Sequence, residues 1–524
     1  MREIDRRRMG KELGRPVLKD RPSVRIALAY PNRYEVGMAS LGFQTVYRLL
    51  NEHPKVRCER VFLREKTASE PLRTFESGES LNRFDLIGFS VSYELDIPNV
   101  VRMLMQAGIP PLSHDRNQAH PLVFLGGAIG GLNPSPLLPF IDGLLAGEGE
   151  GIFDRLADAL HGQRGGHARE QRLDALAELD GMFIPGHHAS VVRRIVDCLK
   201  PPPAYTPIVT PHSHFANMFV IETARGCPRG CLFCAACKIS HPFRLYPVDS
   251  ILDAVRRFNP GAEKIGLEGA GLSDYPQLIP LCRSILDMNR TVSFSSIRAD
   301  RVTREFIPIL EASRIRSFTV APEAGNEAMR RRIGKDIPDT VLMETVDLIS
   351  ESRIDVLKLY YLIGLPEETD DDLNALILSV RDVCRRFLGK SRTRRVRLSV
   401  NAFVPKPFTE FQWAPMLPEQ ELNRKRKRIA EAFKKEPRVV QVPKSGREEI
   451  LQGILSLGDE RIGMGFLRSI REGMGFQQAI AGSGVDLNQL LFKEKNIEDS
   501  MPWDFIHGGV SKDRLWNRYR KGKA

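Results

Sequence analysis

Short apolar runs alternate with stretches of helical spacing through the first third of the chain. Runs of strand length lie at residues 24–30, 60–63, 85–91, 122–127 and 142–150. Helical spacing follows two of them, over residues 42–50 and from residue 99 onward. Uninterrupted apolar strands joined by helices are typical of a parallel sheet covered on both faces. The pattern predicts an α/β fold with a doubly wound parallel sheet in residues 23–162, behind a charged tail of residues 1–22.

Small and polar residues stand where these predicted strands end. Ligands of doubly wound sheets bind at the carboxyl ends of the strands. The residues at those ends include Ser90, Ser92, Gly126, Gly127 and a Gly-Glu-Gly-Glu turn at residues 147–150. We therefore expect Ser90, Ser92, Gly126 and Gly127 to line a ligand site.

A weaker pattern separates this region from a second alternating series. Residues 163–214 combine charged and Pro-rich stretches, as a linker does. Six strand-like segments follow in residues 215–417, namely FVIETA, KIGLEGA, VSFSSIR, SFTVAPE, VLKLYYLIG and RLSVNAFVP. Six β/α repeats are too few for an eightfold barrel. We predict a partial (β/α)6 barrel, followed by a basic, helix-rich region in residues 418–524.

Composition excludes several classes of protein. Eight cysteines in 524 residues are too few for a disulfide scaffold, and 42% hydrophobic residues argue against a disordered chain. The first residues are too often charged for a secretory signal or a lipid anchor. Residues 121–141 carry no formal charge, but their prolines and glycines break any membrane helix. We predict a cytoplasmic protein with no membrane partner.

Four cysteines crowd one loop directly after the first strand of the second series. Cys227, Cys231, Cys234 and Cys237 lie within eleven residues. Thiolates this dense in a reducing compartment indicate a metal, and soft sulfur ligands favour zinc or an iron–sulfur cluster. Structural four-Cys zinc sites usually pair two separated Cys hairpins. A single loop therefore favours an iron–sulfur cluster over zinc.

Two sets of ligands compete for such a cluster. Cys231, Cys234 and Cys237 imitate the ferredoxin run C-x2-C-x2-C-x3-C-P, with His241 in the fourth place, but a second cysteine run is missing. Cys227, Cys231 and Cys234 form CxxxCxxC, which leaves one iron of a four-iron cluster without a protein ligand. An open coordination site is typical of catalytic metals. We favour this second set, with Cys237 as a small buried residue and His241 as structural.

CxxxCxxC on the loop after the first strand of a β/α series resembles the radical S-adenosylmethionine (radical SAM) superfamily. The resemblance implies a 4Fe–4S cluster on Cys227, Cys231 and Cys234, whose open iron is chelated by the amino and carboxylate groups of S-adenosylmethionine. It also implies an external electron donor of the flavodoxin or ferredoxin type. An electron from the reduced cluster would release methionine and a 5′-deoxyadenosyl radical, which abstracts hydrogen from substrate. The protein has to orient these cofactors and exclude water.

Further motifs follow in the order that the family's S-adenosylmethionine site requires. They lie at residues 267–271 (LEGAG), 318–327 (FTVAPEAGNE), 360–369 and 401–413. By this resemblance we expect cofactor contacts from Phe233, Gly269, Ala270, Gly271, Glu323, Ile363, Gly364 and Val404. The glycine-rich turn departs from the family pattern, because the usual Glu of GGE is missing. As alternatives, Glu323 only caps a helix, and residues 360–369 form an ordinary strand-to-turn segment.

A doubly wound domain ahead of such a core resembles the cobalamin-dependent branch of the superfamily, whose members hold the corrin between the two domains. In that arrangement Ser90, Ser92, Gly126 and Gly127 would lie where the nucleotide tail of cobalamin passes. The sequence has no DxHxxG motif for a lower axial ligand, so cobalamin would bind without a protein histidine. A sheet that only supports the barrel is the alternative.

The remaining cysteines and the basic residues narrow the function further. Two cysteines precede the loop, and only Cys282 and Cys384 follow it, too few on either side to hold a second cluster. The net charge of +12 is uneven: residues 385–397 hold seven basic residues and no acid, and residues 424–428 read RKRKR. These runs suggest a surface for a polyanion such as RNA. A solvated helix face is the alternative.

The leading prediction is a radical SAM enzyme with one 4Fe–4S cluster that reductively cleaves S-adenosylmethionine. With cobalamin it would catalyse methyl transfer or rearrangement at an unactivated carbon of a substrate that the sequence does not identify. Two alternatives stay open: a cobalamin-free radical SAM enzyme that modifies RNA, and a non-catalytic iron–sulfur protein that serves in binding or assembly.

Overall fold

The computed structural model describes residues 3–64, 70–161, 168–196 and 202–523. Its first part is a six-stranded sheet in the order β2-β1-β3-β4-β5-β6, and every pair is parallel apart from β5 and β6. The strands are β1 (Val24–Tyr30), β2 (Val56–Phe62), β3 (Leu86–Ser90), β4 (Leu122–Gly126), β5 (Gly143–Leu145) and β6 (Met182–Phe183). The order β2-β1-β3-β4-β5 is a common one for α/β sheets with ligand sites at the strand ends. The predicted α/β fold with a parallel sheet is confirmed.

The helices of this part are α1 (Glu3–Met9), α2 (Tyr34–Gly37), α3 (Leu41–Glu52), α4 (Ile97–Gln106), α5 (Phe153–His161) and α6 (Ala168–Ala177). Two of them, α3 and α4, lie where the sequence pattern predicts them, and the others were not predicted. Helix α3 begins at the N-cap Ser40, whose side chain accepts a hydrogen bond from Phe43 N. Its buried stripe includes Phe43, Tyr47 and Leu50, and it packs against β2.

The second part contains two parallel sheets, in the orders β12-β11-β8 and β13-β14-β15-β16. Their strands are β8 (Met218–Glu222), β11 (Lys264–Glu268), β12 (Thr291–Phe294), β13 (Ser317–Glu323), β14 (Val356–Ile363), β15 (Arg395–Ala402) and β16 (Val439–Gln441). The six predicted strands are therefore present, with β16 added beyond them. The short strands β9 (Ala224–Arg225) and β10 (Arg244–Leu245) pair antiparallel beside the cysteine loop.

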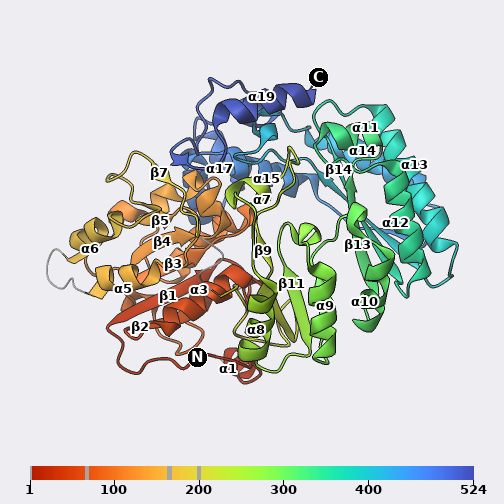
Figure 1. Cartoon of the computed structure of the whole chain (residues 1–524). Coiled ribbons are helices and arrows are strands. Elements are labelled where there is room, and N and C mark those ends of the chain that lie inside the picture. Colours follow the sequence, from red (N-terminus) through yellow and green to blue (C-terminus); the bar gives the residue numbers. More distant parts are fainter. Residues whose placement is uncertain (1–2, 65–69, 162–167, 197–201, 524) are drawn as a thin grey trace.

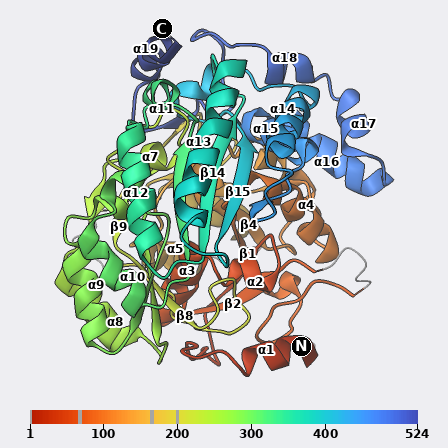
Figure 2. The same ribbon diagram turned by 90° about the vertical axis from the view of Figure 1, so that its right-hand side faces the viewer.

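Helices lie outside these sheets, and Figure 2 shows α13 beside β14 and β15, with α12 next to α13. The helices of this part are α7 (Ala236–Ile239), α8 (Val248–Phe258), α9 (Leu278–Asp287), α10 (Ile307–Ala312), α11 (Glu327–Arg332), α12 (Asp339–Glu351), α13 (Asp370–Leu388) and α14 (Glu419–Ala432). Thr369 and Asp372 form a capping box that starts α13. The fully buried Ile265, Leu357 and Val396 belong to the apolar core between strands and helices.

The C-terminal region packs between the two other parts (Figure 1). Its elements are α15 (Gly446–Leu457), α16 (Glu460–Glu472), α17 (Phe476–Ala481), α18 (Leu487–Phe492), β17 (Ile506–His507) and α19 (Lys512–Lys523). One apolar cluster joins Phe140 of the first part, Trp413 of the second and Phe466 of this region. Asn133 donates to Gly458 O at 2.7 Å. The three parts of the chain therefore share one core.

Part of the predicted linker of residues 163–214 contributes strands to the sheets. It supplies α6, β6 and β7 (Val191–Val192), and β7 pairs in parallel with β17 near the far end of the chain. Residues 163–167 and 197–201 of this segment lie outside the described residues. The segment thus ties the first sheet to the C-terminal region.

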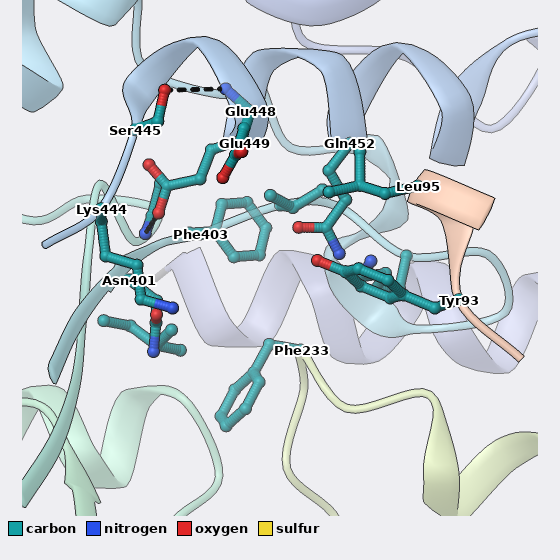
Figure 3. A pocket seen from close by; sticks show the side chains of 14 residues that line it. Tyr93, Leu95, Phe233, Asn401, Phe403, Lys444, Ser445, Glu448, Glu449 and Gln452 are labelled. Carbon is teal, nitrogen blue, oxygen red and sulfur yellow. Dashed lines mark hydrogen bonds between the residues drawn. The ribbon is translucent and has the colours of Figure 1, made fainter. Parts of the chain in front are cut away.

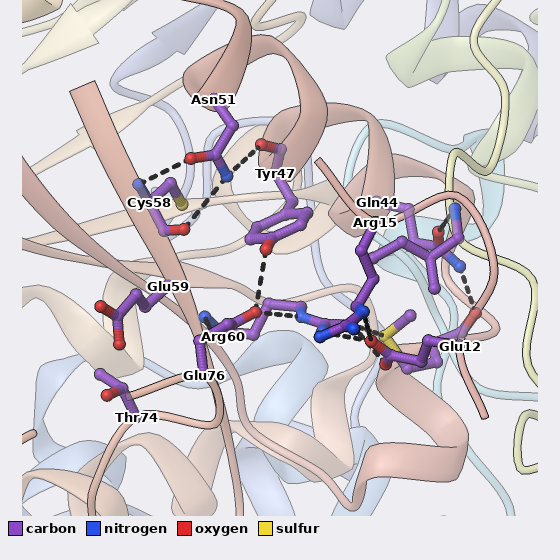
Figure 4. A network of polar contacts seen from close by, with 12 residues as sticks. Glu12, Arg15, Gln44, Tyr47, Asn51, Cys58, Glu59, Arg60, Thr74 and Glu76 are labelled. Atoms are coloured by element: carbon purple, nitrogen blue, oxygen red, sulfur yellow. Dashed lines mark hydrogen bonds and ion pairs between the residues drawn. The ribbon is translucent and has the colours of Figure 1, made fainter. Parts of the chain in front are cut away.

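The predicted N-terminal tail is anchored by a buried ion pair (Figure 4). Both terminal nitrogens of Arg60 donate to the Glu12 carboxylate at 2.8 Å, and Arg60 Nε donates to Glu76 at 2.6 Å. The side chains of Arg60 and Glu12 are fully buried. Tyr34 also donates to Glu12, at 2.6 Å. The tail therefore packs on the first sheet.

None of the helices in the described parts is long and apolar enough to span a membrane. The uncharged segment at residues 121–141 forms β4, a short 3-10 helix (Ala128–Gly131) and a second one (Ser135–Phe140). The predicted absence of a membrane helix from this segment is confirmed.

Replacing Arg60 should destabilise the first part of the chain strongly. Arg60→Met leaves Glu12 and Glu76 buried without their cation, and breaking a buried pair costs about 3–5 kcal/mol. The midpoint of urea unfolding, followed by circular dichroism, should fall clearly. As a control, Arg7→Met removes an exposed pair with Glu3 and should change stability by less than about 1 kcal/mol. Equal midpoints for the two variants would contradict this assignment.

Candidate functional site

The predicted cluster ligands lie on one loop between β9 and α7, and distant segments hold this loop. Leu232 N donates to Ile333 O at 2.9 Å, and Phe411 N donates to Leu232 O at 3.1 Å. At Gly334, whose φ is +72°, an added Cβ would stand 2.6 Å from Gly230 O. Only glycine fits so close an approach in this conformation. The backbone of the loop is therefore fixed from outside.

Cys227, Cys231 and Cys234 are half-buried thiols that lie near one another. Burial raises the pKa of Cys231 to about 11, and the nearby cations Lys335 and Arg298 oppose that rise. Among the described residues, no three His, Cys, Asp or Glu side chains could hold a single metal ion. Neighbouring thiols with the cations Lys335 and Arg298 nearby are compatible with a negatively charged metal cluster.

Cys237 differs from these three thiols. It is buried in α7, and its Sγ donates to Cys234 O at 3.2 Å. Burial raises its pKa to about 12, which favours the neutral thiol. His241, the fourth residue of the ferredoxin-like register, is exposed. Both features fit the predicted structural roles of Cys237 and His241.

Glu323 lies at the end of β13 and points to Lys335, which donates to it at 2.9 Å. Its φ of +70° is unusual for a residue other than glycine. Asn326 caps the following helix, since its side chain accepts from Met329 N at 2.7 Å. The alternative that Glu323 caps that helix is therefore wrong. Lys335 connects the Glu323 carboxylate to the surroundings of Cys231.

Ile363 and Gly364 form the turn that ends β14. Glu368 accepts hydrogen bonds from the backbone nitrogens of Gly364 and Leu365, and Lys425 pairs with Glu368 at 3.3 Å. Ile363 is fully buried, and its carbonyl accepts from Phe403 N at 2.8 Å. The turn is thus rigid, and it joins the ends of β14 and β15.

Phe233 and Val404 meet at a cavity of about 310 Å³. Figure 3 shows Phe233 on one side and Tyr93, Phe403 and Gln452 on others. The lining residues come from the first part of the chain, the cysteine loop, the end of β15 and helix α15. The structure therefore brings two of the expected cofactor-contact residues to one cavity.

A larger cavity, of about 760 Å³, lies between the first sheet and the second part of the chain. Its lining includes six predicted site residues, namely Ser90, Ser92, Gly126, Gly127, Gly269 and Ala270. Gly127 has a φ of +85°, and an added Cβ would stand 2.6 Å from Val91 O. Gly271 lies apart, against Phe243. The predicted site residues thus gather around two cavities, and Glu323, Ile363, Gly364 and Gly271 line neither of them.

An ionic network at the larger cavity joins the two sheets. Arg225, directly before the cysteine loop, pairs with Glu222 at 2.6 Å, Glu150 at 2.7 Å and Glu148 at 3.3 Å. Arg244 also pairs with Glu148, at 2.5 Å. Burial favours a higher pKa for the Glu150 carboxyl, but the nearby Arg225 cation outweighs this effect and the pKa is lowered. The turn at residues 147–150 is thereby held against the start of the cysteine loop.

Glu268 is a second carboxyl at this cavity, and sequence reasoning did not single it out. It ends β11 opposite Glu222 of β8, and both residues line the cavity. Glu268 Oε2 is buried, and no hydrogen-bond partner for it lies in the part of the chain that the structure describes. Burial, with a smaller contribution from Glu222, raises its pKa to about 7. The strand-end rule that indicated Ser90 would also have indicated Glu268, since it follows an apolar run.

Most cations of the basic run at residues 424–428 form ion pairs with carboxylates of the same chain. Lys425 pairs with Glu368, and Arg426 pairs with Glu449. Arg424 and Arg428 both pair with Asp370, at 3.3 and 3.5 Å. Four of the five cations therefore have carboxylate partners. This arrangement gives no support to an RNA-binding surface.

Two family models match the parts that carry these cavities. The model described as "Radical SAM proteins, N-terminal" matches residues 42–185, and the model described as "Radical SAM superfamily" matches residues 221–380. Parallel sheets, a fixed cysteine loop and a large cavity define a cofactor-dependent α/β enzyme. Within that class, this chain belongs to the radical SAM superfamily, whose members use a 4Fe–4S cluster, S-adenosylmethionine and an electron donor.

Individual similar proteins are more distant. "Uncharacterized protein MJ0966" of Methanocaldococcus jannaschii is 27% identical over 445 residues, which cover 83% of this chain and 89% of that protein. The structure of the cobalamin-dependent S-adenosylmethionine radical enzyme OxsB has 16% identity and a TM-score of 0.46 over 68% of this chain and 51% of its own. Escherichia coli coproporphyrinogen III oxidase (HemN) has 14% identity and a TM-score of 0.30 over 41% of this chain and 51% of its own. This chain thus matches about half of each of these two solved structures.

Glu268→Gln should stabilise the protein at high pH only. Because the folded-state pKa is raised to about 7, the wild type loses stability as pH rises from about 4.5 to 7, by at most about 3 kcal/mol. Gln has no such loss, so its advantage in thermal midpoint should grow over that range and then stay constant. The exposed Glu263→Gln is the control. An advantage that is equal at pH 5 and pH 8 would refute the raised pKa.

Proposed function

We propose that this chain is a radical SAM enzyme with one 4Fe–4S cluster bound by Cys227, Cys231 and Cys234. The observation that carries the proposal is the set of three half-buried, neighbouring thiols on a rigid loop directly after β8 and β9. When bound, the reduced cluster supplies the electron that cleaves S-adenosylmethionine and starts hydrogen abstraction. The donor of that electron would be a flavodoxin or a ferredoxin.

The residues around the loop would hold S-adenosylmethionine. We assign Gly269, Ala270 and Gly271 to backbone contact with its methionine end. Glu323, oriented by Lys335, would accept hydrogen bonds from the ribose. Phe233 and Val404 would border adenine, and their shared cavity of about 310 Å³ supports this. Ile363 and Gly364 would border adenine on another side, because they belong to the turn that Glu368 holds rigid.

We further propose that the cavity of about 760 Å³ takes cobalamin. Its position at the carboxyl ends of β1, β3 and β4, facing the second part of the chain, supports this. Ser90, Ser92, Gly126 and Gly127 line it. Two buried polar atoms without partners, Glu268 Oε2 and Arg193 Nε, fit a cavity built for a polar ligand. The reaction would then be methyl transfer or rearrangement at an unactivated carbon.

We also propose a division of the chain into five parts and a cellular location for the protein. The parts are the anchored segment 1–22, the first sheet in residues 23–162, the connection 163–214, the radical SAM core in residues 215–417 and the basic C-terminal region 418–524. We propose a (β/α)6 core and a cytoplasmic protein. A non-catalytic iron–sulfur protein is the competing function, and the next experiment distinguishes it.

Substituting the three proposed ligands one at a time should abolish both the cluster and its chemistry. After anaerobic reconstitution, the wild type should hold about four iron per chain and form 5′-deoxyadenosine with dithionite and S-adenosylmethionine. Cys227→Ala, Cys231→Ala and Cys234→Ala should lose both. Cys237→Ala is the matched control and should keep both. A wild type that holds iron but forms neither 5′-deoxyadenosine nor S-adenosylhomocysteine would favour the non-catalytic function.

Protein purified after cobalamin feeding should retain the corrin, visible in its absorbance spectrum. Gly127→Leu places a bulky side chain against Val91 and into the cavity, so this variant should retain far less corrin. Its iron content should stay that of the wild type, because Gly127 does not touch the cysteine loop in any described contact. A wild type without corrin absorbance would remove cobalamin from the proposal and leave the cluster chemistry standing.

A further inference from the structure

Arg193, directly after β7, is a buried cation at the junction of all three parts of the chain. Its side chain lines the larger cavity, and the residue is 4% exposed. One terminal nitrogen donates to Gly131 O at 2.7 Å, and the other to Lys238 O at 3.4 Å. Phe408 stacks on the guanidinium at 4.6 Å. Every contact described for this side chain is therefore with a neutral group.

The positive charge of the other buried arginines among the described residues is compensated differently. Of these six, five have a carboxylate within ion-pair distance, namely Arg48, Arg60, Arg64, Arg116 and Arg330. Arg394 has none that close, but Asp355 opposes the lowering of its pKa. For Arg193, burial alone lowers the pKa, to about 10. Its charge thus stands without a described acidic partner.

Glu410, an acidic group of this junction, already has two cationic partners. Lys238, whose carbonyl contacts Arg193, pairs through its own Nζ with Glu410 at 2.8 Å. Arg518 pairs with the same Glu410 oxygen at 2.7 Å. The cation of Arg193 consequently gains nothing from a direct ion pair there. A buried charge without a counter-charge is costly, so a negative group from outside the chain would stabilise this junction.

The donors of Arg193 also remain available. A guanidinium has five N–H donors, and the two described hydrogen bonds use two of them. Arg193 Nε is buried and has no hydrogen-bond partner among the described residues. It lies beside Gly131, where an added Cβ would be 3.6 Å from it, and Gly131 lines the same cavity. An Nε–H together with a neighbouring terminal N–H is the edge that binds two oxygens of one anion.

We propose that Arg193 binds an anionic oxygen group, a phosphate ester or a carboxylate, of the molecule that occupies the larger cavity. This inference rests on the proposed function only in that the cavity is a ligand site. Two sources carry the same chemistry: the phosphodiester in the nucleotide tail of cobalamin, and an anionic group of the substrate. Gly131 and Gly509, small residues beside the guanidinium, leave room for such a group.

The test compares Arg193→Gln, which removes the charge, with Arg193→Lys, which keeps it. Arg394→Gln is the matched control, because Arg394 is also buried, also bonds carbonyls and also stacks on a phenylalanine, at 4.8 Å, but lines neither cavity. The probes are hydroxocobalamin and cobinamide, a corrin without the phosphate-bearing tail. Equilibrium dialysis of the full chain gives the dissociation constants.

We expect Arg193→Gln to weaken hydroxocobalamin binding by about tenfold or more, since a hydrogen bond to a charged group is lost, and to leave cobinamide binding unchanged. The dissociation constant of Arg193→Lys for hydroxocobalamin should lie between those of the wild type and Arg193→Gln. That of Arg394→Gln should match the wild type. This pattern assigns the anion to the corrin tail. Unchanged hydroxocobalamin affinity in Arg193→Gln, or an equal loss for both corrins, would overturn the inference.

If the wild type binds neither corrin, the cobalamin proposal fails and the second source is tested. Inorganic phosphate should then raise the thermal midpoint of the wild type and of Arg193→Lys, and leave that of Arg193→Gln unchanged. This result assigns the anion to the substrate. Equal phosphate responses of the wild type and Arg193→Gln, including no response in either, would overturn the inference.

Discussion

The ion pairs of Arg225 are the interaction on which the functional arrangement depends. One guanidinium pairs with Glu222 of β8 and with Glu148 and Glu150 of the turn that follows β5. Because all four side chains are mostly buried, loss of this cation would leave Glu222 and Glu150 without their described ion pair, and Glu148 with Arg244, in a region of low polarity. The residue stands two positions before Cys227. The same contact therefore fixes the cysteine loop, one wall of the larger cavity and the distance between the two sheets.

The apolar core that the three parts of the chain share holds the ion pairs of Arg225 in place. The cluster that contains Phe89, Trp413, Phe466 and Trp503 draws residues from the first sheet, the second part and the C-terminal region. The strand pair β7–β17 and the Asn133 contact with Gly458 O cross the same boundaries. Parts that share one core cannot separate without exposing it to water. The cavity between the sheets is consequently bordered by parts that the shared core holds together.

Local sequence patterns predicted the secondary-structure elements well, but they could not predict contacts between residues far apart in the sequence. The apolar run at residues 24–30 became β1 with the same bounds, and the cysteine spacing identified the loop. Glu12 was read as part of a charged tail, because nothing near it in sequence indicates that Arg60 would bury it. Arg193 lay in a predicted linker, and its significance comes from the absence of a described acidic partner, which only tertiary structure reveals. The run RKRKR suggested an external polyanion, whereas its cations pair with carboxylates from other helices and turns.

The most direct test of the central claim is the electron paramagnetic resonance spectrum of the dithionite-reduced protein with and without S-adenosylmethionine. If Cys227, Cys231 and Cys234 hold the cluster as proposed, S-adenosylmethionine would bind at the iron that lacks a protein ligand and would change the electronic structure of the cluster. The account predicts a 4Fe–4S signal whose g values shift when S-adenosylmethionine is added. A signal that stays the same at saturating S-adenosylmethionine, or a zinc-bound protein without any signal, would contradict it.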